Sequence, residues 1–256
     1  MTRRRGEFGD CRGCPLPDEH GFLSTRLLPV VMRVLRGRAA DPEADRAATR
    51  RLLERTAQTG TPGLRVWRPH RSVAFGRRDA NREGYGQAVR AAKSRGYATV
   101  ERSVGGRAVA FTGSTVAFVR AEPVAEARTG IQARYDRVSA EVREALASLG
   151  VTVEPGEPDG AFCPGTHSLS ARGKLVGLAQ RVRSEVALVS GIVVACDHGQ
   201  LGDVLSPVYG ALDIPFDRDA VGSVARAGGP TDPNEVVTAF RTTLAENPTV
   251  EHVRET

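Results

Sequence analysis

Apolar residues at helical spacing mark the centre of the chain. Between residues 131 and 149, apolar side chains recur at intervals of three and four, as at Val138, Val142 and Leu146, and Gly150 ends the pattern. This spacing places them on one face of a helix. Start and stop signals predict three further helices, at residues 41–58, 86–94 and 233–247.

Short apolar runs bounded by Gly, Pro or polar residues predict strands between these helices. The expected strands lie at residues 64–67, 72–75, 97–100, 108–111, 115–121, 168–171, 175–180 and 186–195, with another near residue 151. The runs at 108–111 and 115–121 are expected to pair across a turn at residues 112–114. Because helices and strands mix without regular βαβ units, we expect an α+β fold with a mixed, largely antiparallel sheet and packed helices.

The length of 256 residues fits one large domain with a sizeable core. Residues 1–24 are rich in Arg, Gly, Pro and Asp without periodicity, so we expect a disordered tail, then one domain over residues 25–248 and a C-terminal tail over residues 249–256. No apolar run approaches the ~18 residues that span a bilayer, and no apolar segment follows the basic start. A cytoplasmic location with no membrane partner is therefore expected.

The positive charge of the chain is concentrated in one region. The net charge is +6, and residues 65–107 carry 11 Arg and Lys against three Asp and Glu. The aromatic residues there are not interleaved with the arginines in a base-stacking pattern. The excess therefore favours a phosphate-bearing ligand or an acidic partner protein over nucleic acid.

The four cysteines are too few and too scattered for a disulfide framework. Cys11 and Cys14 have the spacing of half a zinc site, but no matching Cys or His pair follows, so no metal is expected. Cys196 ends an apolar run and is expected to be a buried strand residue. Cys163 differs, because Pro and Gly follow it directly and a lysine lies eleven residues further on.

That lysine, Lys174, is unusual in this chain. Lys93 and Lys174 are the two lysines among 36 basic residues, and Lys174 stands between Gly173 and Gly177. A compact ammonium differs from a planar guanidinium in reach and hydrogen-bond geometry. A thiol at Cys163 that attacks a carbonyl, with an ammonium to stabilise nearby charge, would suit acyl transfer. The alternative is a buried cysteine near a surface lysine.

A glycine pair offers a second candidate site. Gly105 and Gly106 lie between Arg102 and Arg107, in a turn between two expected strands. Glycines there let backbone amides come close to a carboxylate, a phosphate or an acyl carbonyl. A plain hairpin turn explains the pair equally well.

Three motifs follow one another along the chain: Val73-Ala-Phe-Gly76-Arg77, then Arg102-x-x-Gly-Gly-Arg107, then Phe162-Cys-Pro-Gly165 with Gly173-Lys174-Leu-Val-Gly177. Together they resemble the lipoate–protein ligase and octanoyltransferase superfamily, which shares its catalytic fold with biotin protein ligase. The resemblance covers roughly residues 26–247 and implies the biotin/lipoate protein ligase catalytic-domain fold.

The resemblance also implies roles for single residues. The Gly-Gly loop and the Gly-Lys segment would line a tunnel for an eight-carbon acyl chain, and Lys174 would contact the acyl carbonyl or an adenylate. The Phe-Cys-Pro-Gly segment resembles the cysteine-dependent branch, which includes octanoyl-[glycine cleavage H protein] amidotransferases, so Cys163 is the expected nucleophile. The expected substrate-binding residues are Arg77, Arg102, Gly105, Gly106, Arg107, Gly165, Gly173 and Gly177. The acyl chain needs an apolar groove, for which Val104, Val109, Val176 and Leu178 are candidate lining, although most of them fit an ordinary core equally well. His167 is a candidate base or a solvated loop residue.

The expected function is transfer of an octanoyl or lipoyl group, without a cofactor, to a lysine of a lipoyl carrier such as glycine cleavage H protein or a 2-oxoacid dehydrogenase E2 subunit. One alternative is an ATP-dependent lipoate–protein ligase that uses ATP and Mg; another is a noncatalytic carrier-binding domain. Arg107, Phe111 and Leu178 stand where ligases commonly have glycine, histidine and a polar residue, often serine. These departures weaken the ligase interpretation more than the transferase one.

Overall fold

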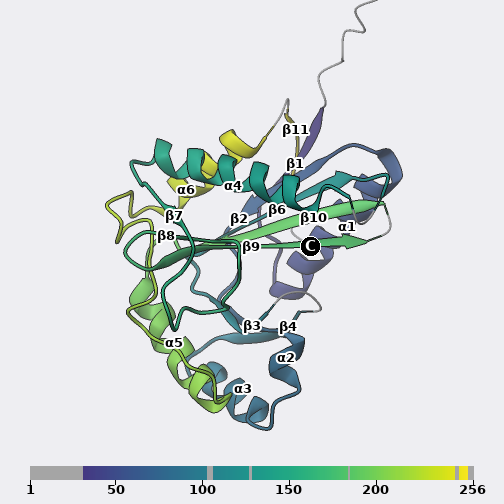
Figure 1. Cartoon of the computed structure of the whole chain (residues 1–256). Coiled ribbons are helices and arrows are strands. Elements are labelled where there is room, and N and C mark those ends of the chain that lie inside the picture. The colour runs from purple at the N-terminus through teal and green to yellow at the C-terminus, as the bar shows by residue number, and fades with distance from the viewer. Residues whose placement is uncertain (1–30, 103–105, 127–128, 184, 246–247, 253–256) are drawn as a thin grey trace, which may run out of the picture.

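The computed structural model describes residues 31–252 except for 103–105, 127–128, 184 and 246–247 (Figure 1). The expected N-terminal tail, with Cys11 and Cys14, lies outside the described residues, as do Val104 and Gly105. Within the described part, no helix is both long and apolar enough to cross a membrane.

One mixed sheet forms the centre of the molecule. Its strands, in spatial order, are β11 (Pro248–His252), β1 (Met32–Arg36), β2 (Gly63–Trp67), β6 (Val116–Pro123), β10 (Val186–Val193), β9 (Lys174–Arg183), β8 (Ser168–Ser170) and β7 (Glu154–Pro155). The β11–β1 and β1–β2 pairs are parallel, and the other pairs of this sheet are antiparallel. The expected α+β fold with a mixed, largely antiparallel sheet is confirmed.

The chain end differs from the expectation. The prediction of a tail over residues 249–256 is wrong for its first four residues, because Pro248–His252 forms edge strand β11 beside β1. Glu251 accepts hydrogen bonds from Arg33 at 2.8 Å and Arg55 at 2.7 Å, which attach this strand to β1 and α1. Such long-range contacts leave no local signal in a short, polar segment.

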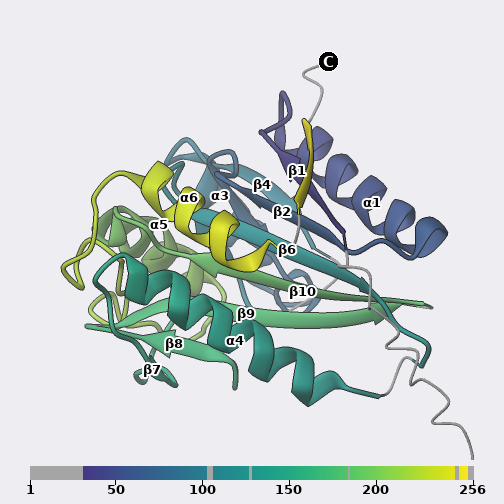
Figure 2. The same cartoon turned by 90° about the horizontal axis from the view of Figure 1, so that it is seen from above.

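Helices cover both faces of the large sheet. On one face, α4 (Ile131–Ser148) and α6 (Pro233–Leu244) lie side by side over the strands (Figure 2). On the other face lies α1 (Pro42–Thr59), which begins at the expected Asp41 cap, whose side chain accepts from the amides of Glu43 and Ala44. The main apolar core lies under α4 and α6. The helices predicted at residues 41–58, 131–149 and 233–247 are confirmed as α1, α4 and α6.

A smaller sheet lies beyond α1 on this second face (Figure 1). It consists of β4 (Ala98–Glu101), β3 (Ser72–Phe75) and β5 (Val109–Phe111), packed with α2 (Arg77–Ala80), α3 (Tyr85–Lys93) and α5 (His198–Ala211). The predicted pairing of residues 108–111 with 115–121 is wrong, because β5 pairs with β3 while β6 pairs with β2 and β10. The turn at Gly113 therefore carries the chain from one sheet to the other.

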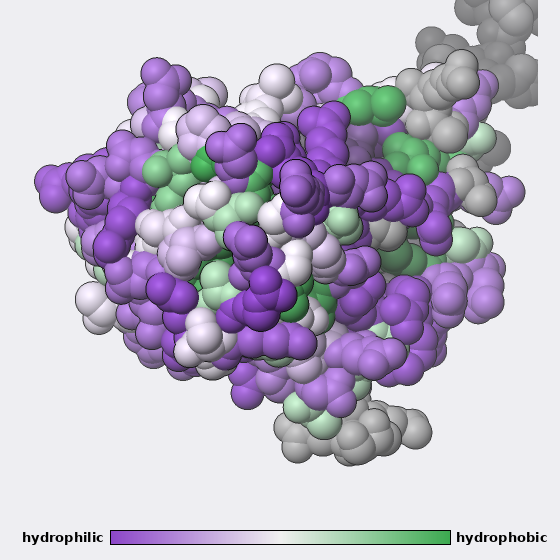
Figure 3. Space-filling view, turned by 90° about the horizontal axis from the view of Figure 1, so that it is seen from below, coloured by the Kyte–Doolittle hydropathy of each residue, from purple (hydrophilic) through white to green (hydrophobic). Residues whose placement is uncertain are grey.

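The surface seen from below is mostly hydrophilic (Figure 3). Apolar side chains appear there in separate patches between charged and polar ones rather than as one broad apolar face.

Candidate active site

Cys163 lies in the loop between β7 and β8, in a backbone conformation that few non-glycine residues adopt. Its φ of 43° is in the left-handed region. Its amide donates to the hydroxyl of Tyr209 at 2.7 Å, and that hydroxyl donates to the carbonyl of Ala108 at 2.9 Å. Burial raises the pKa of Tyr209, so the hydroxyl keeps its proton and can serve both partners. Tyr209 of α5 thus anchors the cysteine to the start of β5.

The sulfur of Cys163 faces the arginine and glycine motif. Arg102 Nη2 donates to Cys163 Sγ at 3.3 Å and to the carbonyl of Arg107 at 2.5 Å. A Cβ atom on Gly106 would lie 3.3 Å from Sγ, so a glycine leaves this side of the sulfur open. The structure therefore brings Cys163, Arg102 and Gly106 together, whereas Gly105 lies outside the described residues.

Lys174 is buried, with 1% of its surface exposed, and its ammonium is saturated. Nζ donates to Glu157 Oε2 at 2.6 Å, to the carbonyl of Phe162 at 3.0 Å and to the carbonyl of Cys163 at 2.8 Å. These three bonds use its three protons. Lys174 therefore holds the backbone of the cysteine, and the cation that contacts the sulfur belongs to Arg102.

Glu157 completes this arrangement. Its Oε1 accepts from the amide of Gly165 at 2.8 Å, and its Oε2 accepts from Ser168 Oγ at 2.8 Å as well as from Lys174. We call the Glu157–Lys174 ion pair with these bonds the clasp. It closes the loop of residues 162–168 around Cys163. Sequence reasoning missed Glu157 because its three partners follow at distances of 8, 11 and 17 residues, which match no motif.

Cys163 lines a cavity of about 430 Å³, which we call the thiol cavity. Its apolar lining includes Val109, Phe118, Phe162, Leu178 and Ile192. This volume is in the range of small-molecule sites in proteins. Two of the expected lining residues, Val109 and Leu178, are in this wall, whereas Val176 packs in the main core.

The other expected site residues divide into two groups. Gly165, Gly177 and His167 line the thiol cavity, and the His167 ring stacks on Tyr135 with 3.5 Å between ring centroids. Gly173 does not: its φ of 110° forms a turn, and a Cβ there would lie 2.6 Å from the amide nitrogen of Gly222. The remaining two do not line the thiol cavity: Arg77 is exposed on α2, and Arg107 pairs with buried Asp79 at 3.4 Å.

The remaining cysteine and metal predictions concern other parts of the chain. Cys196 is a free, half-buried residue just beyond β10 rather than inside that strand, and burial raises its thiol pKa. In the described ranges, no cluster of three or more His, Cys, Asp or Glu side chains could hold a metal ion.

Curated proteins are similar to part of this chain. Among curated proteins, the octanoyl-[GcvH]:protein N-octanoyltransferase of Geobacillus kaustophilus is 32% identical over 127 residues, which cover 49% of this chain and 45% of the relative. The lipoyl-[GcvH]:protein N-lipoyltransferase of Listeria monocytogenes is 25% identical over 138 residues, which cover 54% of this chain and 49% of the relative. The chain thus spans about half the length of the curated relatives it matches.

Solved structures share the fold. A crystal structure of lipoate-protein ligase A bound with ATP superposes with a TM-score of 0.64 at 21% identity, covering 88% of this chain and 87% of that one. The expected biotin/lipoate protein ligase type of fold is confirmed. The family model described as lipoyl protein ligase A/B catalytic domain matches residues 41–252. Since that match covers well over half of the sequence, the chain belongs to the lipoyl protein ligase A/B catalytic domain family.

Proposed function

We propose that the chain transfers an octanoyl or lipoyl group to a lysine of a lipoyl carrier protein through a thioester on Cys163. The observation that carries this proposal is the setting of the sulfur, which accepts a hydrogen bond from Arg102 at the wall of an apolar cavity. The names of the curated relatives, which pair octanoyl or lipoyl groups with GcvH, support both the acyl group and the carrier.

The reaction has two steps. The Cys163 thiol loses its proton, and the thiolate attacks the acyl carbonyl carbon of a thioester or amide donor. The new C–S bond replaces the C–S or C–N bond of the donor, and the leaving sulfur or nitrogen takes up that proton. The neutral amine of the acceptor lysine then attacks the thioester carbon. The new C–N bond replaces the C–S bond, the amine loses its proton, and the thiolate returns.

The chain contributes charge and position to both steps. The Arg102 guanidinium stabilises the sulfur while it is negative, both before attack and when it leaves. The clasp fixes the backbone of Cys163 through Lys174, and the thiol cavity takes the acyl chain. The Gly106 amide is a candidate donor to the acyl oxygen, because Gly106 lies beside the sulfur and has no side chain that would block an acyl group there.

The bonds of the clasp argue against the ATP-dependent alternative. A lysine that binds an acyl adenylate needs a free proton, and the three protons of Lys174 already serve Glu157 and two carbonyls. We therefore expect transfer without ATP, Mg or another cofactor. The noncatalytic alternative requires that Cys163 is never acylated.

Intact-mass spectra test the proposal. Wild-type protein incubated with an octanoyl thioester should gain the mass of one octanoyl group, and should pass it to apo glycine cleavage H protein without ATP. Cys163→Ser should do neither, because an alkoxide is far harder to form at neutral pH than a thiolate. ATP-driven modification of the carrier by Cys163→Ser would overturn the transferase in favour of a ligase, and an unmodified wild type would favour the noncatalytic domain.

A further inference from the structure

The second step of the proposed reaction releases a proton that the groups described so far do not accept. When the amine of the acceptor lysine attacks the thioester, its nitrogen bonds to the acyl carbon and must lose a proton before a neutral amide remains. A base in the wall of the thiol cavity would accept this proton where it is released.

The wall of the thiol cavity offers few candidates. In the described part of the chain, five titratable side chains line it, and none of them is a carboxylate. They are Arg102, Tyr135, Cys163, His167 and Lys174.

Four of the five cannot act as the base. An arginine does not give up its charge in a protein. The three protons of Lys174 serve Glu157 and two carbonyls. Burial raises the pKa of Tyr135, so its hydroxyl keeps its proton. Cys163 carries the acyl group during this step. The imidazole of His167 remains, and a neutral imidazole can accept a proton near neutral pH.

Tyr135 of α4 holds the ring of His167 in place. The two rings stack with 3.5 Å between centroids and 12° between their planes. The hydroxyl of Tyr135 accepts from the amide of Gln180 at 2.7 Å, and the carbonyl of His167 accepts from the amide of Leu178 at 2.9 Å. Both residues are thereby attached to β9, which fixes the imidazole at the cavity wall.

The ring nitrogens of His167 are free to bond. Stacking covers the face of an imidazole and leaves its nitrogens, which lie at the edge, available. His167 is half-buried, and among the described residues none hydrogen-bonds to its ring nitrogens. By contrast, His70 bonds the carbonyl of Ala39, and His198 bonds the hydroxyl of Ser223. His167 therefore has the uncommitted nitrogen that a base requires.

We propose that His167 is the general base that accepts the proton of the acceptor lysine when its amine attacks the thioester on Cys163. This inference rests on the proposed function. The amine nitrogen bonds to the acyl carbon, its proton passes to a ring nitrogen of neutral His167, and the bond between the acyl carbon and Cys163 Sγ breaks with its electron pair on sulfur. The imidazolium then releases the proton to water.

Separate measurement of the two steps tests His167. In His167→Gln, acylation of Cys163 by an octanoyl thioester should stay within twofold of wild type, because the contacts of Arg102 and Lys174 with the cysteine are untouched. Transfer from the isolated acyl-enzyme to apo glycine cleavage H protein should fall about a hundredfold, because a general base is lost. Intact-mass spectra should show the octanoyl-enzyme accumulating.

Two further variants separate a base from a structural role. His167→Phe keeps a ring that can stack on Tyr135 but has no nitrogen, so its transfer should be as slow as that of His167→Gln. His198→Gln is the matched control, since His198 is half-buried and does not line the thiol cavity, and its transfer should stay within twofold. Restored transfer in His167→Phe, or an equal loss in His198→Gln, would overturn the proposal.

Hydroxylamine probes the thioester without a base. It is mostly neutral at neutral pH and attacks thioesters readily, so it should cleave the octanoyl-enzymes of wild type and His167→Gln at rates within twofold. Slow cleavage in the variant alone would show that the thioester has moved or become covered. The loss of transfer would then have a structural cause, and the proposal would fall.

A pH series gives a signature of the base itself. An imidazole ordinarily titrates at about pH 6.5, and its protonated form cannot accept another proton. The ratio of wild-type to His167→Gln transfer rates should therefore decrease as the pH falls through this range. The other four titratable groups of the wall are present in both proteins, so their effects cancel in the ratio. A ratio that is constant with pH would exclude His167 as the base.

The wild type distinguishes failure of this inference from failure of the proposed function. If wild type is never acylated by the octanoyl thioester, the thioester mechanism falls and the base falls with it. If wild type is acylated and passes the group to the carrier, but His167→Gln does so at the same rate, the role of His167 falls alone.

Discussion

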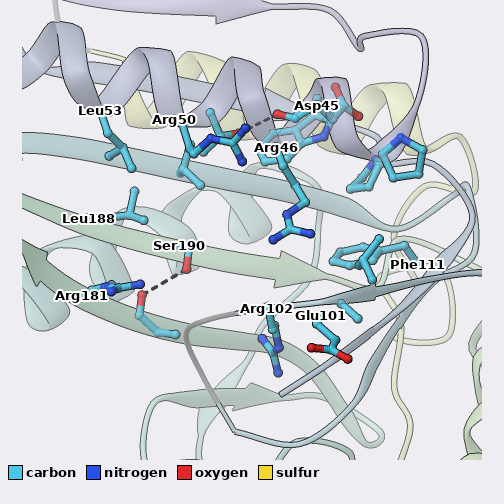
Figure 4. A pocket seen from close by; sticks show the side chains of 18 of the residues that line it. Asp45, Arg46, Arg50, Leu53, Glu101, Arg102, Phe111, Arg181, Leu188 and Ser190 are labelled. Carbon is cyan, nitrogen blue, oxygen red and sulfur yellow. Dashed lines mark hydrogen bonds between the residues drawn. The ribbon is translucent and has the colours of Figure 1, made fainter. Parts of the chain in front are cut away.

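Two neighbouring cavities share a wall, but the charged groups at one are bonded within the protein, whereas several at the other are exposed. Around the thiol cavity, Lys174 is buried with its three protons committed, and Arg102 bonds both the sulfur and a carbonyl. Around the larger neighbouring cavity of about 720 Å³ beside α1, the α1 cavity (Figure 4), Arg46, Arg50 and Arg183 are exposed on surface elements. The bonds around the thiol cavity fix its side chains in one geometry, whereas the exposed arginines of the α1 cavity can change theirs.

This difference separates two kinds of sensitivity. A fixed, buried set of bonds fails when an atom moves by about 1 Å, even when charge is conserved. An exposed set of charges tolerates such shifts but responds to charge sign and to salt. Substitutions that conserve charge should therefore damage the thiol cavity and spare the α1 cavity.

The largest expected effect comes from Lys174. Lys174→Arg keeps the charge, but a planar guanidinium cannot reach Glu157 and two carbonyls in the space of an ammonium, so carrier octanoylation should fall about a hundredfold, nearly as far as in Lys174→Ala. Lys174→Ala should also lower the free energy of unfolding by about 2–4 kcal/mol, because it leaves the mostly buried Glu157 unpaired. Transfer rates measured below the melting temperatures, with Lys93→Arg as the silent control, check this. An active Lys174→Arg would mean that any positive charge suffices.

A smaller effect is expected at Arg102, where the two cavities meet. Arg102→Ala removes the donor to Sγ and should slow both acylation and alkylation of Cys163 by iodoacetamide about tenfold, since a charge-assisted hydrogen bond is lost. Arg102→Lys should recover part of the rate. Peptide mapping of the alkylated protein reports on Cys163 and Cys196 separately. Cys196 serves as the internal reference, because burial raises its thiol pKa and its slow alkylation should be the same in both proteins. Equal alkylation of Cys163 in wild type and Arg102→Ala would remove Arg102 from the mechanism.

Gly106 should show a steric effect of a few-fold. In Gly106→Ala the new methyl group would lie 3.3 Å from Sγ, which is tight but adjustable, so acylation should slow about threefold while stability changes little. Gly199→Ala is a matched control, because no heavy atom in the described part of the chain lies within 4 Å of its added Cβ. Rates of octanoyl gain by intact mass measure both variants. Unimpaired acylation in Gly106→Ala would show that substrate approaches the sulfur from another side.

The fold could be predicted where the signal is local. The Asp41 cap and Pro42 give the start of α1, and three- and four-residue spacing gives α4. Strand partners could not be predicted, because β5 and β6 follow one another across a short turn yet join different sheets. Helix α5 was missed since its segment contains Pro207 and three glycines, and packing with α3 overrides their weak helix propensity.

The residues of the site could also be predicted only where they belong to a local motif. Cys163, Lys174, Arg102 and Gly106 stand in motifs, and the structure places all four around one loop. Their contacts could not be predicted from the motifs: Lys174 was expected to contact the acyl group, and no spacing signal indicated that its three protons bond Glu157 and two backbone carbonyls. Residues that act through distant contacts, such as Glu157 and Tyr209, carry no spacing signal at all.

The smallest expected effect tests charge at long range. Arg77 and Arg78 are exposed on α2 and line neither cavity. The positive charge of Arg77 nevertheless helps to lower the pKa of Arg181, which lines the α1 cavity. In Arg77→Glu/Arg78→Glu, the KM for apo glycine cleavage H protein should rise about twofold at low salt, since exposed charges contribute little each.

Salt should erase this difference. The Debye length is about 10 Å at 0.1 M salt and about 3 Å at 1 M, so the double variant and wild type should converge as salt rises. A salt series of the carrier KM for wild type and the double variant measures this. If the effect of the α2 reversal persisted at high salt, the carrier would contact α2 directly, and the basic region of residues 65–107 would form part of its docking surface.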